Sequence, residues 1–299
     1  MIQNNHEAES LFISGDAFET IARLYDVGNA VNMQGMAMRE NVLYAFKVAR
    51  DNSCQVLYRV CLDTGEAALC VDSSTGEKMT DYLTHANDAC LFERNGELLM
   101  LVATMAQDKT ALMELKVDKE RFWPLRGYGL DLPGRGLIRT SAVEILSQDA
   151  VGLTLLLNDR NDCYYASLSF EAASDTLQLT PAFTLDVSQA PYKGRFCLLD
   201  VDEYYWQGIT VRGGKLIAPR THEADSVFLV FDLHQGGSVL MPDPALSFCI
   251  SDKVFKKLEA EGCGFDKDGH LYFNSNRRNG RYEEHFDAVH RLRNYIAPF

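Results

Sequence analysis

The sequence lacks the features that mark several classes of protein. No apolar run approaches the roughly 20 residues that a membrane-spanning helix needs. No basic segment followed by an apolar stretch, the pattern of a secretory signal peptide, opens the chain. Phosphate-binding loops, dinucleotide fingerprints, nucleophile elbows and Ser-x-x-Lys motifs are also missing. We therefore expect a cytoplasmic protein without a cofactor, although an exported chain that had been trimmed would look the same.

Basic side chains and paired cysteines are also scarce. The chain has 29 Lys and Arg residues against 42 Asp and Glu residues, for a net charge of −13. This balance repels the phosphates of nucleic acids and anionic membrane surfaces, so neither is expected as a partner. The eight cysteines form no C-x-x-C pair, and several lie in strand-like apolar runs. We expect buried free thiols and no metal site, because zinc sites need paired thiol or imidazole spacing.

The chain does contain an internal repeat. Segments 89–99 and 262–272 share one pattern without a gap: small, Cys, Leu or Gly, Phe, acid, base, Asn or Asp, Gly, polar, Leu, apolar. Weaker copies bring the start points to 34, 88, 141, 207 and 261, at spacings of 54, 53, 66 and 54 residues. A period of about 50 residues with strand–turn–strand content predicts a β-propeller, because one blade cannot bury its own faces.

The spacing of the copies predicts an all-β fold with five four-stranded antiparallel blades in one domain, residues 1–299. The interval from position 261 around to position 34 is 71 residues, which is one blade and a connection. The last copy is one outer strand short, and residues 19–25 are expected to supply it. Such a closure pairs both chain ends in one sheet and removes an open edge.

Equivalent positions in the blades of a propeller lie on one ring near the central channel. The residue expected just before each innermost strand is polar, and four further residues flank these positions. The ring is Gln34, Asp88, Ser141, Gln207 and Glu261, and the flanking residues are His85, Asn87, Thr140 and Trp206. Converging polar groups in a concave site are typical of ligand binding. The alternative is that they hold channel water.

Two members of this ring carry a carboxyl group. Asp88 and Glu261 come from different blades and are candidates for a general acid and base, as in glycoside hydrolysis. His85 is a third catalytic candidate, or else packs on the rim of the channel. The extra residues at 187–205 form a longer loop, which is either functional or a plain insertion.

Two polar loops in the middle of the chain have simpler interpretations. Residues 133–136 (Pro-Gly-Arg-Gly) do not lie between a strand and a helix, so we interpret them as an inter-blade loop. Residues 158–162 (Asn-Asp-Arg-Asn-Asp) lie between two apolar runs and indicate a hairpin connection. Metal binding is the less favoured interpretation of the second loop.

The heads of the copies resemble a known family. Gln34-Gly35, the segment 85–88 (His-Ala-Asn-Asp), Gln207-Gly208 and Glu261-Gly262 resemble helveticin J-like proteins, bacterial propellers related to a group associated with teichoic acid biosynthesis. The likeness follows the chain in order from residue 34 to 275, and Ser141 departs from it. The resemblance implies a bacteriocin or cell-wall role and supplies no catalytic residues.

These observations lead to one favoured function and two alternatives. The favoured one is binding of a polar small molecule or glycan in the central funnel. This ligand would be a carbohydrate or a glycan related to the cell wall. Gln34, Asn87, Asp88, Gln207 and Glu261 are expected to bind its hydroxyl groups, and Trp206 or Tyr205 to stack on a sugar ring. The alternatives are a glycoside hydrolase or lyase that uses Asp88 and Glu261, and a protein-interaction platform on the blade-top loops. Propellers host many functions, so the fold does not choose.

Overall fold

The computed structural model describes most of the chain, and all its regular elements are β-strands. The described residues are 11–13, 17–171, 173–192, 195–198, 204–222, 225–251, 255, 257–278 and 285–299. In this part of the chain no α-helix occurs. Accordingly, none of the described segments is a helix with the length and apolar character to cross a bilayer.

Most strands belong to antiparallel meanders that follow the chain. The first group is β3 (Ala30–Arg39), β4 (Val42–Ala49), β5 (Gln55–Cys61) and β6 (Ala67–Leu69), with β8 (Met79–Thr80) added on β5. The second group is β9 (Asp88–Arg94), β10 (Glu97–Ala103), β11 (Leu112–Asp118) and β12 (Arg121–Leu132), which also pairs with β13 (Gly136–Ile138). The third group is β14 (Ala142–Gln148), β15 (Gly152–Asp159), β16 (Asp162–Ser169) and β17 (Thr176–Leu185).

The last two groups include strands from the start of the chain. The fourth group is β20 (Tyr204–Trp206) and β21 (Thr210–Arg212) on β22 (Lys215–His222), then β23 (Asp225–Asp232), β25 (Phe248–Ile250) and β1 (Leu11–Ile13). The fifth group is β26 (Lys257–Phe265), β27 (His270–Arg278), β28 (Ala288–Ile296) and β2 (Phe18–Arg23). Strands β18 (Gln189–Tyr192) and β19 (Arg195–Leu198) form a separate hairpin.

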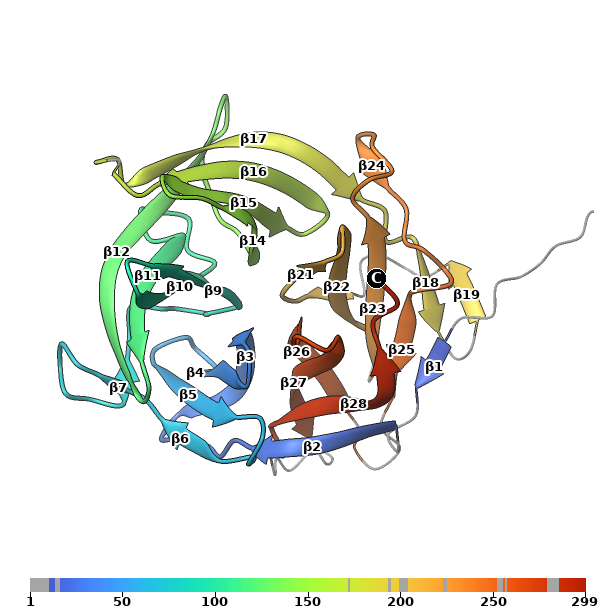
Figure 1. Cartoon of the computed structure of the whole chain (residues 1–299), viewed down its shortest axis with the longest axis horizontal. Helices are drawn as coiled ribbons and strands as arrows, with labels where there is room; N and C mark the ends of the chain where they lie inside the picture. The colour runs from blue at the N-terminus through green and yellow to red at the C-terminus, as the bar shows by residue number, and fades with distance from the viewer. Residues whose placement is uncertain are drawn as a thin grey trace, which may run out of the picture.

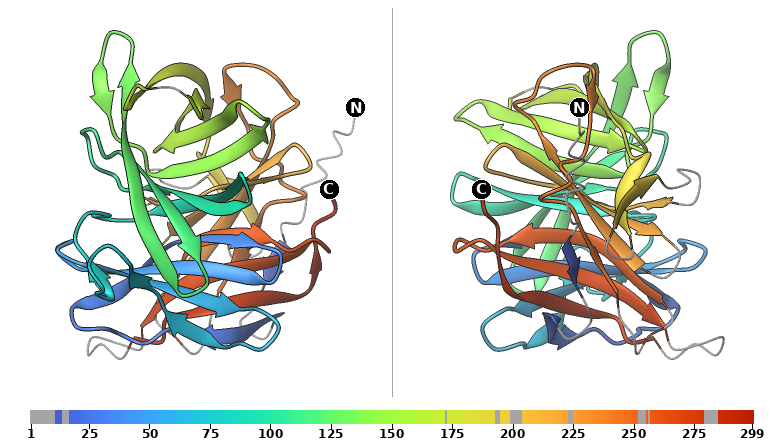
Figure 2. Two further views of the ribbon diagram at one scale, coloured as in Figure 1. Left: turned by 60° about the vertical axis from the view of Figure 1, so that its left-hand side comes forward. Right: turned by 90° about the vertical axis from the view of Figure 1, so that its right-hand side faces the viewer.

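The groups stand around a common centre, as in a β-propeller (Figure 1). The innermost strands follow one another around this centre in the order β3, β9, β14, β21 and β26. On the outside, short parallel pairings connect neighbouring groups: β7 (Val71–Asp72) with β12, β12 with β17, and β17 with β24 (Val239–Leu240). The hairpin that joins β12 to β13 extends beyond the ring (Figure 2).

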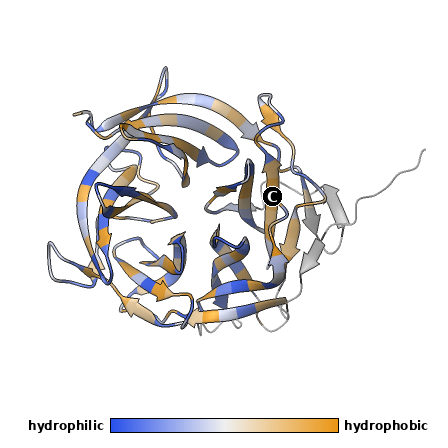
Figure 3. Ribbon diagram, viewed as in Figure 1, coloured by the Kyte–Doolittle hydropathy of each residue, from blue (hydrophilic) through white to orange (hydrophobic). Residues whose placement is uncertain are grey.

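Apolar side chains fill the spaces between neighbouring groups. In the described residues, buried side chains form clusters between the first and second groups, the second and third, the third and fourth, the fourth and fifth, and the fifth and first. Figure 3 shows apolar residues along the strands and polar residues in the connecting loops. Each group therefore depends on both neighbours to bury its faces.

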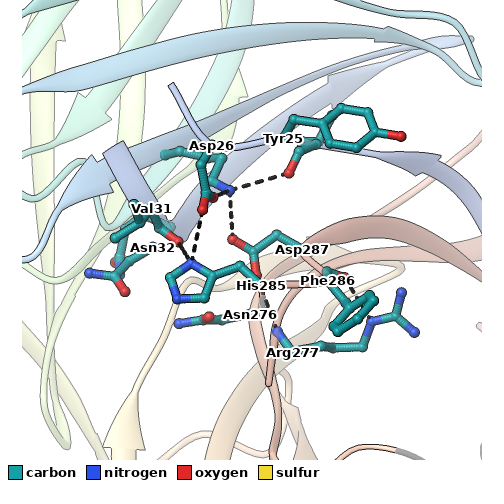
Figure 4. A network of polar contacts seen from close by, with 12 residues as sticks. Tyr25, Asp26, Val31, Asn32, Asn276, Arg277, His285, Phe286 and Asp287 are labelled. Atoms are coloured by element: carbon teal, nitrogen blue, oxygen red, sulfur yellow. Dashed lines mark hydrogen bonds and ion pairs between the residues drawn. The ribbon is translucent and has the colours of Figure 1, made fainter. Parts of the chain in front are cut away.

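A buried ion-pair network joins the first and fifth groups next to β2. The ammonium of Lys47, fully buried on β4, lies 2.5 Å from Asp26 Oδ1 and 2.9 Å from Asp287 Oδ2, and donates to the Leu24 carbonyl at 3.2 Å. His285 donates to the Val31 carbonyl at 2.6 Å, beside Asp26 (Figure 4). Asp26, His285 and Asp287 lie close enough together to bind a metal ion, but the ammonium of Lys47 already pairs with both carboxyl groups.

The structure corrects where two innermost strands begin. Gln34 and Glu261, expected just before their strands, lie inside β3 and β26. The pairing register shifts at both places, between Met33 and Met36 and between Ala260 and Gly262. A β-bulge therefore marks the ring position on these two strands, and the sequence pattern does not separate a bulge from a strand end. Asp88 does begin β9.

Candidate functional site at the channel axis

Glycines allow the innermost strands to approach closely at the axis. A Cβ atom on Gly35 would lie 2.5 Å from the backbone of Asp88, and one on Gly208 would overlap the Asp88 carboxyl group. Gly262 would meet the side chain of Met36 at 2.8 Å. The glycines of these Gln-Gly and Glu-Gly dipeptides therefore serve packing: a backbone lies against Gly35, and side chains lie against Gly208 and Gly262.

The Asp88 side chain is buried where the innermost strands approach one another. Its Oδ2 accepts the backbone N–H of Val143, on β14, at 3.0 Å and that of Ile209, next to β21, at 3.2 Å. Burial raises the pKa of Asp88 well above its usual value, and the two backbone hydrogen bonds only partly oppose this effect. Asp88 thus connects three strand groups at the axis.

Hydrogen bonds run around the axis from each group to the next. The first group is bound to the second by Gly35 N–H to the Ala86 carbonyl (3.0 Å), and the second to the third by Asn87 Nδ2 to the Ser141 carbonyl (2.7 Å). Val211 N–H donates to Glu144 Oε2 at 3.3 Å between the third and fourth groups.

The remaining two connections complete this circle. Gly208 N–H donates to the Glu261 carbonyl at 2.9 Å, which joins the fourth group to the fifth. Asn274 Nδ2 donates to the Gln34 carbonyl, which joins the fifth to the first. The ring predicted from the sequence is therefore brought together, and its members hold the groups to one another.

A layer of buried polar side chains lies on one side of Asp88, near the N-terminal ends of the innermost strands. Gln207 Nε2 and Asn276 Nδ2 donate to the carboxylate of Glu259 at 3.2 and 3.4 Å, and Lys257 lies 2.5 Å from it. Burial, followed by the charge of Glu259, raises the pKa of Glu261 well above its usual value.

Three amide oxygens of this layer have no hydrogen-bond partner in the structure. They are Gln34 Oε1, Asn274 Oδ1 and Asn276 Oδ1, on side chains that are more than nine-tenths buried. Buried acceptors of this kind normally find a donor. The layer therefore has an unused capacity to accept hydrogen bonds from hydroxyl or amino groups.

The flanking residues predicted from the sequence are more peripheral. His85 Nδ1 donates to Asn52 Oδ1 at 2.9 Å, and burial lowers the pKa of the ring. Trp206 is half-buried, and the Arg220 guanidinium lies 4.4 Å from the centre of its ring, so one aromatic face is already occupied. Tyr205 is 63 % exposed. Lys193, in the long loop, lies outside the described residues.

A cavity of about 170 Å³ lies on the other side of Asp88, farther along the innermost strands. All five innermost strands contribute to this axial cavity, which we define by Met36, Met38, Cys90, Glu144, Thr210, Arg212, Cys263 and Phe265. In the described residues each innermost strand pairs with one strand only, so its other edge turns backbone N–H and C=O groups toward the axis.

Glu144 is the carboxyl residue of the axial cavity. Burial raises its pKa from the usual 4.5 to about 7, against hydrogen bonds from Ile145, Thr210 and Val211. Arg212 lies at the rim, where its guanidinium donates to the Asp266 carbonyl at 2.8 Å. A carboxyl group that titrates near neutral pH is suited to exchange protons with a ligand.

Reasoning from the sequence did not single out Glu144, Thr210 or Arg212. Each lies three to five residues beyond a ring position, at 141 or 207. Strand alternation would not have identified them, because offsets of three and five residues place them on the opposite face from the ring positions. The seven described cysteines are free, as expected; five are buried, and Cys90 and Cys263 are among these.

No family model matches the chain, and no curated protein matches it. The resemblance to helveticin J-like proteins therefore stays a prediction.

Several solved structures resemble the chain at low identity. A β-xylosidase, RS223, is 12 % identical with a TM-score of 0.46, over 90 % of this chain and 93 % of that one. An α-L-arabinanase mutant from Cellvibrio cellulosa is 10 % identical with a TM-score of 0.44, over 88 % and 91 %. The aldose sugar dehydrogenase of Streptomyces coelicolor, in its PQQ-bound form, is 10 % identical with a TM-score of 0.45, over 92 % and 97 %. These scores are all below 0.5, so the function is argued from the site alone.

Proposed function

We propose that the chain is a five-bladed β-propeller that binds a small hydroxyl-bearing ligand, of the carbohydrate class, in the axial cavity. In this interpretation the strand groups are the blades, the β12–β17 pairing is a contact between two of them, and β2 completes the last blade. The clusters between all neighbouring groups support this count.

The observation that carries the ligand class is the lining of the cavity. The inner edge of each innermost strand carries backbone donors and acceptors in alternation, of which the N–H groups of Val143, Ile209 and Val211 already donate to Asp88 and Glu144. A sugar hydroxyl both donates and accepts hydrogen bonds, so it matches such a lining better than a purely apolar or purely anionic group. Glu144 and Thr210 add side-chain partners inside the same space.

The size of the cavity limits the ligand. Drug-sized molecules occupy sites of about 300–1,000 Å³, whereas this cavity holds about 170 Å³. The ligand is therefore a single sugar ring, or one terminal residue of a glycan whose remainder lies outside. The rim guanidinium of Arg212 favours a neutral or acidic sugar.

In this proposal, the ring residues predicted from the sequence lie at the end of the axial cavity nearest the N-termini of the innermost strands. Asp88 forms the floor between the cavity and the polar layer. Gln34, His85, Asn87, Ser141, Trp206, Gln207 and Glu261 stay candidates for ligand contact from the other side. The amide oxygen of Gln34, which has no hydrogen-bond partner, supports this second location in the polar layer.

The test is calorimetric titration with a panel of neutral, amino and acidic monosaccharides. Glu144→Gln and Arg212→Gln are each expected to weaken binding of the best ligand by about tenfold, the usual cost of one hydrogen bond to a charged group. Glu66→Gln, an exposed change of the same kind, is the control. If no sugar binds, or if both variants bind as the unmodified chain does, the axial proposal is wrong.

A glycoside hydrolase is the second candidate, and the pKa of about 7 for Glu144 favours it. Glycoside hydrolysis needs two carboxyl groups on either side of the scissile bond. Chromogenic glycosides should be tested with Glu144→Gln, Asp88→Asn and Glu261→Gln. Turnover that only Glu144→Gln abolishes would place the acid in the cavity, and loss in the other two would support the sequence-predicted pair.

A protein-interaction platform is a further proposed function, and a cytoplasmic location is a separate proposal. Exposed Tyr205 supports the first, because aromatic residues are enriched at interfaces. A pull-down that depends on residues 187–205, and not on the axial cavity, would favour it. Fractionation of the source cells would test the location.

A further inference from the structure

A larger pocket lies away from the axis, on the outer part of the third strand group. It has a volume of about 370 Å³, within the range of about 300–1,000 Å³ for small-molecule sites. The hairpin after β12 forms one wall, and β16 and β17 form the floor. The two polar loops noted in the sequence, 133–136 and 158–162, contribute Arg135 and Asp162 to it.

The pocket exists because the outer edge of β17 is covered only at its two ends. β12 pairs with Thr176–Gln178, and β24 pairs with Thr184 and Leu185. Between them, residues 179–183 have no outer partner among the described strands. Pro181 lies on this edge without an N–H group, and the pairing register shifts beside it. An edge interrupted in this way does not accept another strand, so the opening stays available to a small molecule.

The floor of the pocket is apolar and aromatic. Leu132, Tyr164 and Phe183 line it and are 6, 7 and 9 % exposed. Leu132 and Tyr164 belong to the cluster between the second and third groups, and Phe183 to the cluster between the third and fourth. Tyr164 and Phe183 therefore point to opposite faces of the third group, and the pocket lies at the sheet edge between them, where the core holds both side chains in place.

Two opposite charges stand at the rim. Arg135 and Asp162 are both exposed lining residues, and Thr184 holds Asp162 by donating to Oδ1 at 3.0 Å. Both charges act on the Tyr164 hydroxyl: burial and Asp162 raise its pKa, and Arg135 lowers it. Both side chains border the same opening. No ion pair joins them among the described residues, so each has capacity for a ligand.

We propose that this pocket binds a zwitterionic amino acid with an apolar side chain. The ligand carboxylate is expected to pair with Arg135, its ammonium with Asp162, and its side chain with Leu132 and Tyr164, which line the pocket from one cluster. A zwitterion has no net charge, so the overall charge of −13 does not repel it as it repels an anion. This site is independent of the axial cavity.

The experiment is calorimetric titration of the whole chain with phenylalanine, phenylacetate and phenethylamine. Phenylalanine carries both charges, and each of the other two lacks one of them. We expect phenylalanine to bind at least about tenfold more tightly than either analogue, because each charged hydrogen bond contributes about that factor. No measurable binding of phenylalanine at about 10 mM, the weak limit for so small a ligand, would overturn the proposal.

Variants locate the site. Arg135→Gln should bring phenylalanine binding down to the level of phenethylamine, and Asp162→Asn to that of phenylacetate. Ala182→Trp should fill the space and abolish binding of all three. Arg121→Gln, an exposed arginine at the other end of β12, is the matched control. Circular dichroism and the melting temperature show whether each variant is folded. Phenylalanine binding that survives all three pocket variants in folded protein would refute the site.

Discussion

Replacing Glu144 by Gln should make the protein less sensitive to rising pH. Burial raises the pKa of Glu144 to about 7, so the folded state holds this proton more tightly than the unfolded chain does. The stability that the protonated group contributes is fully present below a pH of 4.5, the usual pKa of this group. It is lost as the pH rises through 7, because the folded state must then bury a charge. The Gln variant has no such charge at any pH.

The size of the effect follows from the shift in pKa. A shift from 4.5 to about 7, at about 1.36 kcal/mol for each unit, corresponds to about 3 kcal/mol. Glu144 is half-buried, and solvent reduces this figure, so we expect about 1–3 kcal/mol between pH 4 and pH 8. The amide of Gln cannot accept from both Ile145 and Val211, which costs about 1 kcal/mol at every pH.

Urea unfolding at a series of pH values between 4 and 9 measures the prediction. The informative quantity is the difference in unfolding free energy between the variant and the unmodified chain, plotted against pH. It should rise in favour of the variant between pH 4 and pH 8, whatever its starting value. Glu66→Gln, at an exposed position, should give a flat line. A flat line for Glu144→Gln as well would show that Glu144 ionises normally in the folded state, and the argument for an acid in the cavity would fail.

Three further changes test the packing around the axis and the ring closure. Lys47→Met leaves the buried Asp287 carboxylate without its partner, so it should cost about 3–5 kcal/mol in urea unfolding, and a cost below 1 kcal/mol would contradict the ion-pair network. Gly35→Ala places a Cβ atom 2.5 Å from the Asp88 backbone and should prevent folding or lower the melting temperature by more than 10 °C, judged by circular dichroism. Gly262→Ala comes closest to a methionine side chain, at 2.8 Å, and its nearest backbone atom is 3.3 Å away, so its melting temperature should fall by less than half as much, and equal losses in the two alanine variants would refute this distinction.

The repeat located much of the site because identical positions in a repeat occupy equivalent places in the fold. The sequence pattern placed Gln34, Asp88 and Glu261 on one ring, and the structure joins the strand groups at this ring by hydrogen bonds. The same pattern misplaced Gln34 and Glu261 relative to their strands. Both sit at bulges, and a bulge is a matter of pairing register with the next strand, which a single segment does not record.

The roles of the ring residues required the structure. A polar residue at the axis can face a ligand, water or a neighbouring backbone, and these have the same sequence signature. Asp88 accepts N–H groups from segments 55 and 121 residues away in the chain, so its hydrogen bonds depend on how distant strands meet. The pKa of Glu144 likewise depends on its burial among five strands that are far apart in sequence.

The order of residues alone was enough to predict an all-β chain, its repeat and the ring of polar positions, because alternation, turn residues and period are local properties. The axial cavity and the outer pocket do not follow from local properties of the sequence. The axial cavity arises where five strand edges fail to meet, and the outer pocket arises where β12 and β24 leave part of β17 uncovered. The size of each space depends on the distances between strands that are far apart in the sequence, so no single segment of the sequence predicts it.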